Sequence, residues 1–134
     1  MLSPDGETEL FEIRAGVMQG DTLAPYLFVI ILDYIMRQAI GEDQNNLGFT
    51  IEERKSRRFP AVKITDLDFA DDIALLSDEI QQAQELLTRI ETSAAKVGLH
   101  MNVKKTKVMP FNQTEEVQLK TRNGKSLETV VEFK

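Results

Sequence analysis

Residues 62–77 constrain the fold most, because two adjacent aspartates interrupt a run of β-branched, aliphatic and aromatic side chains. Apolar residues stand on both sides of Asp71 and Asp72 in the stretch FADDIALL. Since aspartate tolerates the unusual backbone angles of a tight turn, the pattern predicts two strands joined by such a turn. The sequence therefore predicts two like charges at the tip of a β-hairpin.

The segment 23–40 predicts a helix that is buried on most of its surface, because its apolar residues are dense on every face. Pro25 falls in the first turn and Gly41 follows the last, as is typical of helix boundaries. Asp21 or Thr22 is the predicted N-terminal cap.

A second helix is predicted over residues 80–97, where apolar side chains recur every three or four positions before Gly98. Ser77 or Asp78 is its predicted cap. Its apolar positions are Ile80, Ala83, Leu87, Ile90, Ala94 and Val97. This spacing predicts an amphipathic helix that lies on a sheet.

Shorter segments complete the predicted architecture. Strands are expected around residues 10–13 and 49–51, a loop followed by a strand over 101–111, and a two-residue hairpin turn at Asn123-Gly124. The order strand, helix, hairpin, helix, strand, hairpin predicts an α+β fold with a mostly antiparallel sheet and two helices packed on one face.

Charge and composition exclude some classes of site and disfavour some functions. The chain has 134 residues, a net charge of −6 and no cysteine, which excludes disulfides and thiolate metal sites and is compatible with an intracellular setting. Its longest apolar run, 26–32, is too short to cross a membrane. The acidic balance disfavours a self-sufficient nucleic-acid binder. Two basic clusters are expected to be solvated loop or helix-end charge: Arg54, Lys55, Arg57, Arg58 and Lys63, and Lys104, Lys105 and Lys107.

Two aspartates at one turn allow two interpretations. They can be ordinary turn residues that face water, which is the usual case for an isolated pair. Alternatively, a divalent cation offsets the repulsion between them, because Mg²⁺ prefers hard oxygen ligands and is held by one or two carboxylates together with phosphates. Two such ions support nucleotidyl transfer.

Three motifs occur in one order: GVMQGDTLAPYLF from Gly16, FADDIALLSD from Phe69 and GLHMNVKKTKVM from Gly98. Together they resemble the reverse transcriptase domain of non-LTR (LINE-like) retrotransposons, and the similarity spans nearly the whole chain. The resemblance implies the C-terminal half of a polymerase palm that acts as an RNA-directed DNA polymerase.

The resemblance also implies site residues. Asp71 and Asp72 would be catalytic metal ligands for Mg²⁺, with Mn²⁺ as a possible substitute. Lys105, or its neighbour Lys104, would assist the leaving pyrophosphate. Asn102 is expected to organise its turn.

For nucleotide and template binding, the resemblance implies four further residues. Gln19 and Gly20 would lie against the incoming dNTP and the template, and Gly20 would allow close backbone approach because it has no Cβ. Phe69 and Ala70 would shape the hairpin beside the primer end. The partners of the intact parent protein would be an RNA template and a DNA primer, and no membrane is expected.

Residues 1–134 are expected to be a partial domain. The earlier aspartate block of a palm, the fingers and the thumb are not found, so the chain is expected to be inactive alone. The alternative is a non-catalytic retroelement remnant that acts as a protein or nucleic-acid interaction module. A partial palm is also expected to expose apolar surface and to self-associate.

Overall fold

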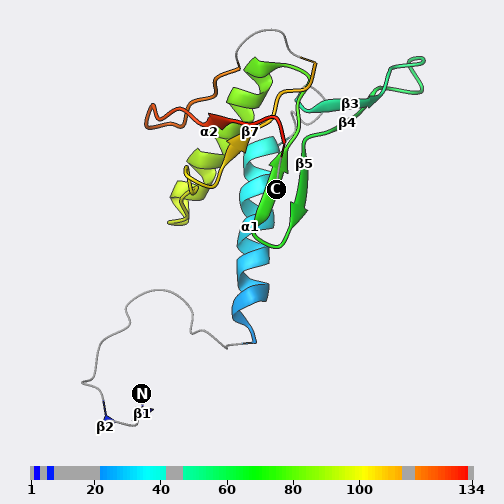
Figure 1. The fold of residues 1–134 in the computed structure, drawn as a ribbon. Helices are drawn as coiled ribbons and strands as arrows, with labels where there is room; N and C mark the ends of the chain where they lie inside the picture. The colour runs from blue at the N-terminus through cyan, green and yellow to red at the C-terminus, as the bar shows by residue number, and fades with distance from the viewer. Residues whose placement is uncertain (1, 4–5, 8–21, 42–46, 113–116, 133–134) are drawn as a thin grey trace.

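The structure, a computed structural model, describes residues 2–3, 6–7, 22–41, 47–112 and 117–132. Its fold class is α+β, as predicted, with two helices and short strands (Figure 1). The predicted strand around residues 10–13 lies outside the described residues. The elements are β1 (Leu2–Ser3), β2 (Gly6–Glu7), α1 (Ala24–Ile40), β3 (Phe49–Glu52), β4 (Val62–Ile64), β5 (Asp66–Phe69), β6 (Asp72–Leu75), α2 (Ile80–Lys96), β7 (Lys107–Val108) and β8 (Glu128–Thr129).

The described strands form four separate two-stranded ladders. Three ladders are antiparallel, namely β1–β2, β3–β4 and β5–β6, and β7–β8 is parallel. Only Thr65 separates β4 from β5, and its carbonyl accepts a hydrogen bond from the backbone N–H of Leu76 at 2.8 Å. Two hairpins, β3–β4 and β5–β6, therefore follow one another along the chain with a one-residue joint between them.

A first apolar cluster joins the two helices to the β5–β6 hairpin. Its buried members come from the C-terminal half of α1, from α2 and from the segment before β3, and Ile73 and Leu75 of β6 pack against them. Leu86 is completely buried at its centre. The buried members are Met36, Ile40, Leu47 and Leu86. This packing fixes the hairpin against the helices.

A second cluster covers another side of α2 with the C-terminal segment, through Leu87, Leu119 and Leu127. The hairpin predicted near residue 123 is present, with a three-residue loop in place of a two-residue one. The backbone N–H of Gly124 donates to Thr121 O, and Thr121 N–H donates to Lys125 O, each at 2.8 Å. Gly124 has φ +75°, the left-handed conformation that a loop of this length requires.

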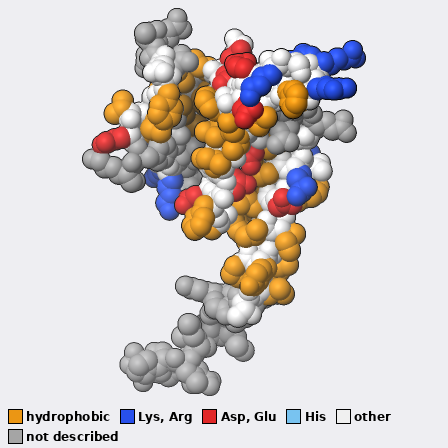
Figure 2. Space-filling view, turned by 90° about the vertical axis from the view of Figure 1, so that its right-hand side faces the viewer, with side chains coloured by type: hydrophobic (Ala, Val, Ile, Leu, Met, Phe, Trp, Pro, Cys, Tyr) orange, Lys and Arg blue, Asp and Glu red, His pale blue; other side chains and the backbone are white. Residues whose placement is uncertain are grey.

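The prediction that the first helix is buried on most of its surface is wrong. Only Ile35, Met36, Ala39 and Ile40, all near its C-terminal end, are buried. The N-terminal half projects away from the rest of the described molecule (Figure 1), and Figure 2 shows hydrophobic side chains gathered along it. The exposed apolar residues are Leu23, Tyr26, Leu27, Val29, Ile30, Ile31 and Tyr34. The apolar density was correctly identified, but no other described element covers this half of the helix.

Neither helix uses its predicted cap. Leu23 occupies the cap position of α1 and Glu79 that of α2, and neither makes a side-chain capping bond. Of the two candidates for α1, Thr22 precedes the cap position, and Asp21 lies outside the described residues. Ser77 donates its hydroxyl to the carbonyl of Glu79, and Asp78 bonds to Thr50 of β3. Asp78 therefore ties the β3–β4 hairpin to the start of α2.

Gly48 fixes the entry into β3. Its φ is +100°, and a Cβ added there would lie 2.6 Å from the carbonyl oxygen of Ile64 and 2.9 Å from Cγ2 of Thr65. Only glycine combines that backbone conformation with such close approach. The start of β3 is consequently pressed against the joint between the two hairpins.

Candidate active site at the β5–β6 hairpin

Ala70 and Asp71 form the two-residue loop of the β5–β6 hairpin. The flanking register pairs Phe69 with Asp72 and Asp68 with Ile73. This confirms the hairpin predicted from the apolar residues on both sides of the aspartate pair, and it places both adjacent aspartates at the tip.

Ala70 adopts a left-handed backbone conformation with φ +57°, and Asp71 does not have positive φ. Positive φ at the first loop residue alone is the pattern of a type II′ turn, which normally has glycine at that position. An L-residue there carries a conformational cost of about 1–2 kcal/mol. The hairpin retains this turn because Ile73 and Leu75 hold it against the core.

The hairpin has one solvent-exposed face and one packed face, because side chains alternate along each strand. Phe69 and Asp72 lie opposite each other on the solvent-exposed face, and Phe69 is 82% exposed. Ile73 and Leu75 point to the other face and pack on the core. Asp71 and Asp72 are both exposed, so a ligand can reach their carboxylates from solvent.

On the packed face, sequence reasoning missed an acidic group. Asp68 is exposed, but partial desolvation raises the pKa of its carboxyl, and the negative charges of Asp66 and Asp33 raise it further. Asp33 is on α1, where it forms an ion pair with Arg37 at 2.8 Å. The spacing of alternate residues in a strand could have shown that Asp66 and Asp68 share a face, but not that α1 brings Asp33 towards them.

Lys105 lies on a separate loop. The Asn102 side chain accepts hydrogen bonds from the backbone N–H groups of Lys104 and Lys105, at 3.2 and 3.4 Å, so Asn102 organises this turn as predicted. Lys105 is exposed and makes no ion pair with either aspartate in the part of the chain described. The structure thus brings together Phe69, Ala70, Asp71 and Asp72. Gln19 and Gly20 lie outside the described residues.

The donor set at the tip fits part of a divalent metal site. Two adjacent, exposed carboxylates supply the hard oxygen ligands that Mg²⁺ prefers. Among the described residues, however, no group of three or more histidine, cysteine, aspartate or glutamate side chains is placed to hold a metal ion. Asp71 and Asp72 therefore offer two ligands of a set that needs further oxygens from elsewhere.

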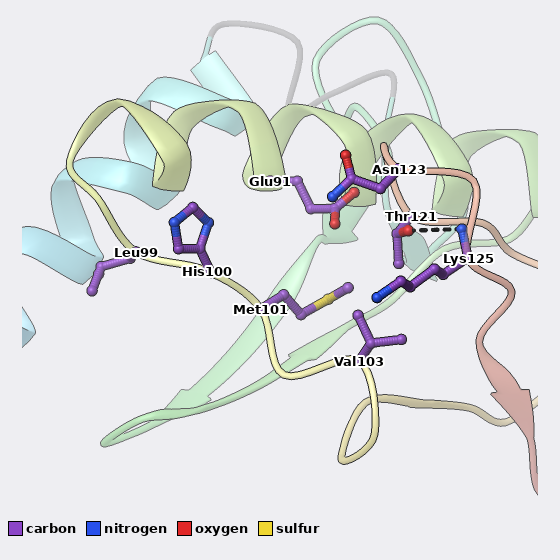
Figure 3. Close-up of a pocket in the computed structure, with 8 residues that line it drawn as sticks. All are labelled: Glu91, Leu99, His100, Met101, Val103, Thr121, Asn123 and Lys125. Carbon is purple, nitrogen blue, oxygen red and sulfur yellow. Dashed lines mark hydrogen bonds between the residues drawn. The ribbon is translucent and has the colours of Figure 1, made fainter.

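A small hollow lies between the C-terminal end of α2, the loop after it and the turn at residue 123 (Figure 3). Its volume is about 90 Å³, whereas pockets that enclose nucleotide-sized ligands are on the order of 300 Å³ or more. In Figure 3 the Lys125 side chain runs past Val103 towards Met101. The residues lining it are Glu91, Leu99, His100, Met101, Val103, Thr121, Asn123 and Lys125. None of them belongs to the hairpin tip, and the hollow is too small for a nucleotide.

Comparisons of the sequence with a family model and with curated proteins agree on one family. A family model described as "Reverse transcriptase (RNA-dependent DNA polymerase)" matches residues 1–127. The chain is 32% identical over 109 residues to the "Retrovirus-related Pol polyprotein from type-1 retrotransposable element R2" of Nasonia vitripennis, covering 79% of this chain and 10% of that protein. It is 41% identical over 71 residues to the protein of the same description from Popillia japonica, covering 53% of this chain and 10% of that one.

A third relative, from Drosophila melanogaster, is the "Retrovirus-related Pol polyprotein from type-2 retrotransposable element R2DM", 30% identical over 78% of this chain and 9% of its own length. The chain spans about a tenth of the length of these curated relatives. No solved structure matches the chain at a significant level. In the described residues, neither helix has the length and apolar character that crossing a membrane requires.

Proposed function

The chain belongs to the reverse transcriptase (RNA-dependent DNA polymerase) family, and we propose that it is part of the palm of a retrotransposon reverse transcriptase. The observation that carries the proposal is the β5–β6 hairpin, which exposes Asp71 and Asp72 at a tip with a left-handed residue beside them. Unfavourable backbone angles concentrate at functional sites, where the surrounding structure maintains them.

In this proposal Asp71 and Asp72 are metal ligands, with Asp71 the more direct. Enzymes of this family use divalent metal ions, and Mg²⁺ is the proposed ion here, with Mn²⁺ able to replace it. The bound metal would supply the charge that activates the primer 3′-hydroxyl and stabilises the departing pyrophosphate. Lys105 is proposed to act on that pyrophosphate, by analogy with the family motif.

Four other residues are proposed to position the substrates. Phe69, exposed on the same face as Asp72, would contact the primer end, and Ala70 would set the turn. Gln19 and Gly20 would lie against the incoming dNTP and the template. The RNA template and DNA primer are partners that the family implies for the intact protein.

We further propose that residues 1–134 are a partial domain that is inactive alone. A two-metal site depends strongly on its full ligand set, and the described residues provide only two adjacent carboxylates at the tip. The missing aspartate block, fingers and thumb would complete it in a longer protein.

The second candidate function is a non-catalytic interaction module. The exposed apolar half of α1 favours it, because exposed apolar patches of this kind commonly mark interaction surfaces. Self-association through this surface would appear in light scattering as a mass that rises with concentration, whereas a constant monomer mass would contradict it.

Manganese binding tests the proposed ligands directly. We expect the chain to bind Mn²⁺, measured by the loss of the free-ion electron paramagnetic resonance signal, and the Asp71→Asn/Asp72→Asn variant to bind at least about tenfold more weakly. The matched control is Asp66→Asn/Asp68→Asn, which removes the same charge from the packed face of the same hairpin. Equal loss in both variants, or no loss in either, would refute the assignment.

Primer extension tests the partial-domain proposal. The chain would be given an RNA template, a DNA primer, dNTPs and Mg²⁺ or Mn²⁺, beside the Asp71→Asn/Asp72→Asn variant. We expect no extension from either protein. Extension by the parent chain alone would mean that another carboxylate, in this chain or in a second copy, completes the site.

A further inference from the structure

The connection between β3 and β4 carries a concentrated positive charge on an acidic protein. Four of the sixteen lysines and arginines of the chain lie within residues 54–58, although the net charge is −6. This connection extends away from the helices (Figure 1), and Figure 2 shows lysine and arginine side chains gathered at the upper edge of the molecule there. We call residues 54–59 the basic arm.

The backbone of the basic arm is an ordered turn. Phe59 N–H donates to Ser56 O at 3.2 Å, and Lys55 N–H donates to Phe59 O at 3.1 Å. The Ser56 hydroxyl accepts a hydrogen bond from Arg58 N–H at 3.2 Å, as serine commonly does at the first position of a turn. Arg57 and Arg58 therefore occupy the two central positions of the turn.

The central arginines have no carboxylate partner among the described residues. Lys55 is paired with Glu52 at 3.6 Å, and Arg54 donates to Ser56 O at 3.4 Å, so these two are partly engaged. Arg57 and Arg58 are exposed and form no ion pair in the described part of the chain. Phe59 beside them is 66% exposed.

The base of the arm is fixed, in contrast to its open tip. Asp78 accepts hydrogen bonds from the backbone N–H and the hydroxyl of Thr50, the latter at 2.6 Å, and its carboxylate lies 3.8 Å from Lys63 Nζ. Gly48 presses the start of β3 against Ile64. Lys63 is thus used internally, and the free positive charge is confined to the tip.

We propose that the basic arm contacts the phosphate backbone of a nucleic-acid duplex, outside the aspartate hairpin. Guanidinium groups bind phosphate oxygens in a bidentate manner, and an ordered turn presents two of them without a competing carboxylate. The exposed ring of Phe59 offers an apolar surface on which a backbone sugar packs. The inference rests on the proposed function, since it names a further substrate contact of the same protein.

A membrane surface is the less favoured partner. Interfacial binding to anionic lipid combines positive charge with an apolar face that enters the bilayer, whereas the basic arm has one exposed apolar side chain, that of Phe59, and no apolar face. Phosphate recognition needs only the guanidinium groups that the tip presents.

Fluorescence anisotropy with a labelled RNA–DNA hybrid tests the arm. Measuring in EDTA makes the result independent of metal binding at Asp71 and Asp72, so failure here and failure of the proposed active site are distinguishable. We expect Arg57→Gln/Arg58→Gln to weaken binding about tenfold at low salt and to reduce the slope of log K against log salt by about two.

The matched control is Lys96→Gln/Arg122→Gln, which removes two exposed positive charges at the end of α2 and in the turn at residue 122. It is expected to change affinity less than about threefold. Equal losses in the two variants, or no binding by the parent chain, would overturn the proposal. So would arm-dependent binding to phosphatidylserine vesicles without binding to the hybrid.

Discussion

The two consecutive hairpins use the same backbone motif and present opposite charges. The β5–β6 hairpin has a two-residue loop with Asp71 at its tip and Asp72 beside it, whereas the β3–β4 hairpin has a longer connection with Arg57 and Arg58 at its tip. The β5–β6 hairpin packs against the helices through Ile73 and Leu75. The β3–β4 hairpin is held mainly at its base, through Asp78.

This difference indicates how each tip is positioned. Apolar packing along a whole face holds the acidic tip in place and maintains an unfavourable turn at Ala70. The basic tip has an ordinary turn, and only its base is fixed, so its position depends on a few polar contacts and one glycine. Substitutions that remove one kind of support test how each hairpin is held in place.

The largest expected effect is at Leu86, which is 0% exposed beneath the β5–β6 hairpin. Leu86→Ala leaves a cavity and is expected to lower the free energy of unfolding by about 3 kcal/mol. Urea unfolding followed by circular dichroism measures it. The control is Leu67→Ala, on the solvent-exposed face of the same hairpin, which is expected to lower the free energy of unfolding by less than about 1 kcal/mol. A comparable loss at both positions would show that the hairpin is not held by its packed face.

At the base of the other hairpin, Gly48→Ala is expected to cost about 2–3 kcal/mol, because the new Cβ would overlap the Ile64 carbonyl and the backbone has positive φ. Gly41→Ala is the matched control. Gly41 also has positive φ, with ψ −145°, but nothing lies within 4 Å of its Cβ position, so only a conformational cost of about 1–2 kcal/mol is expected. Equal thermal shifts would mean that the close approach is unimportant.

Asp78→Ala is expected to cost about 1–2 kcal/mol at neutral pH through the lost bonds to Thr50. The Thr50 hydroxyl bond lowers the pKa of Asp78 below its ordinary value of 3.8, despite an opposing effect of burial. A lowered folded-state pKa stabilises the fold above the ordinary pKa, and this stabilisation is lost as pH falls through the folded-state value.

The deficit of Asp78→Ala should therefore shrink as the pH falls through the lowered folded-state pKa of Asp78. Unfolding at neutral pH and at a series of pH values below 3.8, with Glu79→Ala as the neighbouring control, measures this change. A deficit independent of pH would exclude a role for the Asp78 charge.

The smallest expected effect is stabilising. Ala70→Gly removes the cost of a left-handed L-residue, and we expect a gain of about 0.5–1 kcal/mol after the added chain entropy of glycine is subtracted. Ala74→Gly, within β6, should lose about the same amount. A loss in both variants would contradict the turn geometry assigned to Ala70.

Local signals in the sequence predicted the elements well. The aspartate pair flanked by apolar segments predicted the β5–β6 hairpin, and Pro25, Gly41 and Gly98 predicted the helix ends. These predictions succeeded because turn chemistry and helix termination depend on a few neighbouring residues.

Long-range features could not be predicted in this way. The bond from Asp78 to Thr50 joins residues 28 positions apart, and the exposure of the first half of α1 depends on which elements cover it. An aspartate that caps a helix and an aspartate that bonds to a distant strand look alike in sequence, since both stand just before a helix. The roles of Asp71, Asp72 and Lys105 came from family motifs and stay proposals.

Thr65, the buried one-residue joint between the two hairpins, has a consequence for insertions and deletions. One added residue there would reverse the alternation of β5, turning Asp66 and Asp68 to solvent and Leu67 and Phe69 towards the helices. It would also change the orientation of the basic arm relative to Asp71 and Asp72. Length changes in this region should therefore be tolerated within the connection between β3 and β4 and excluded at residue 65.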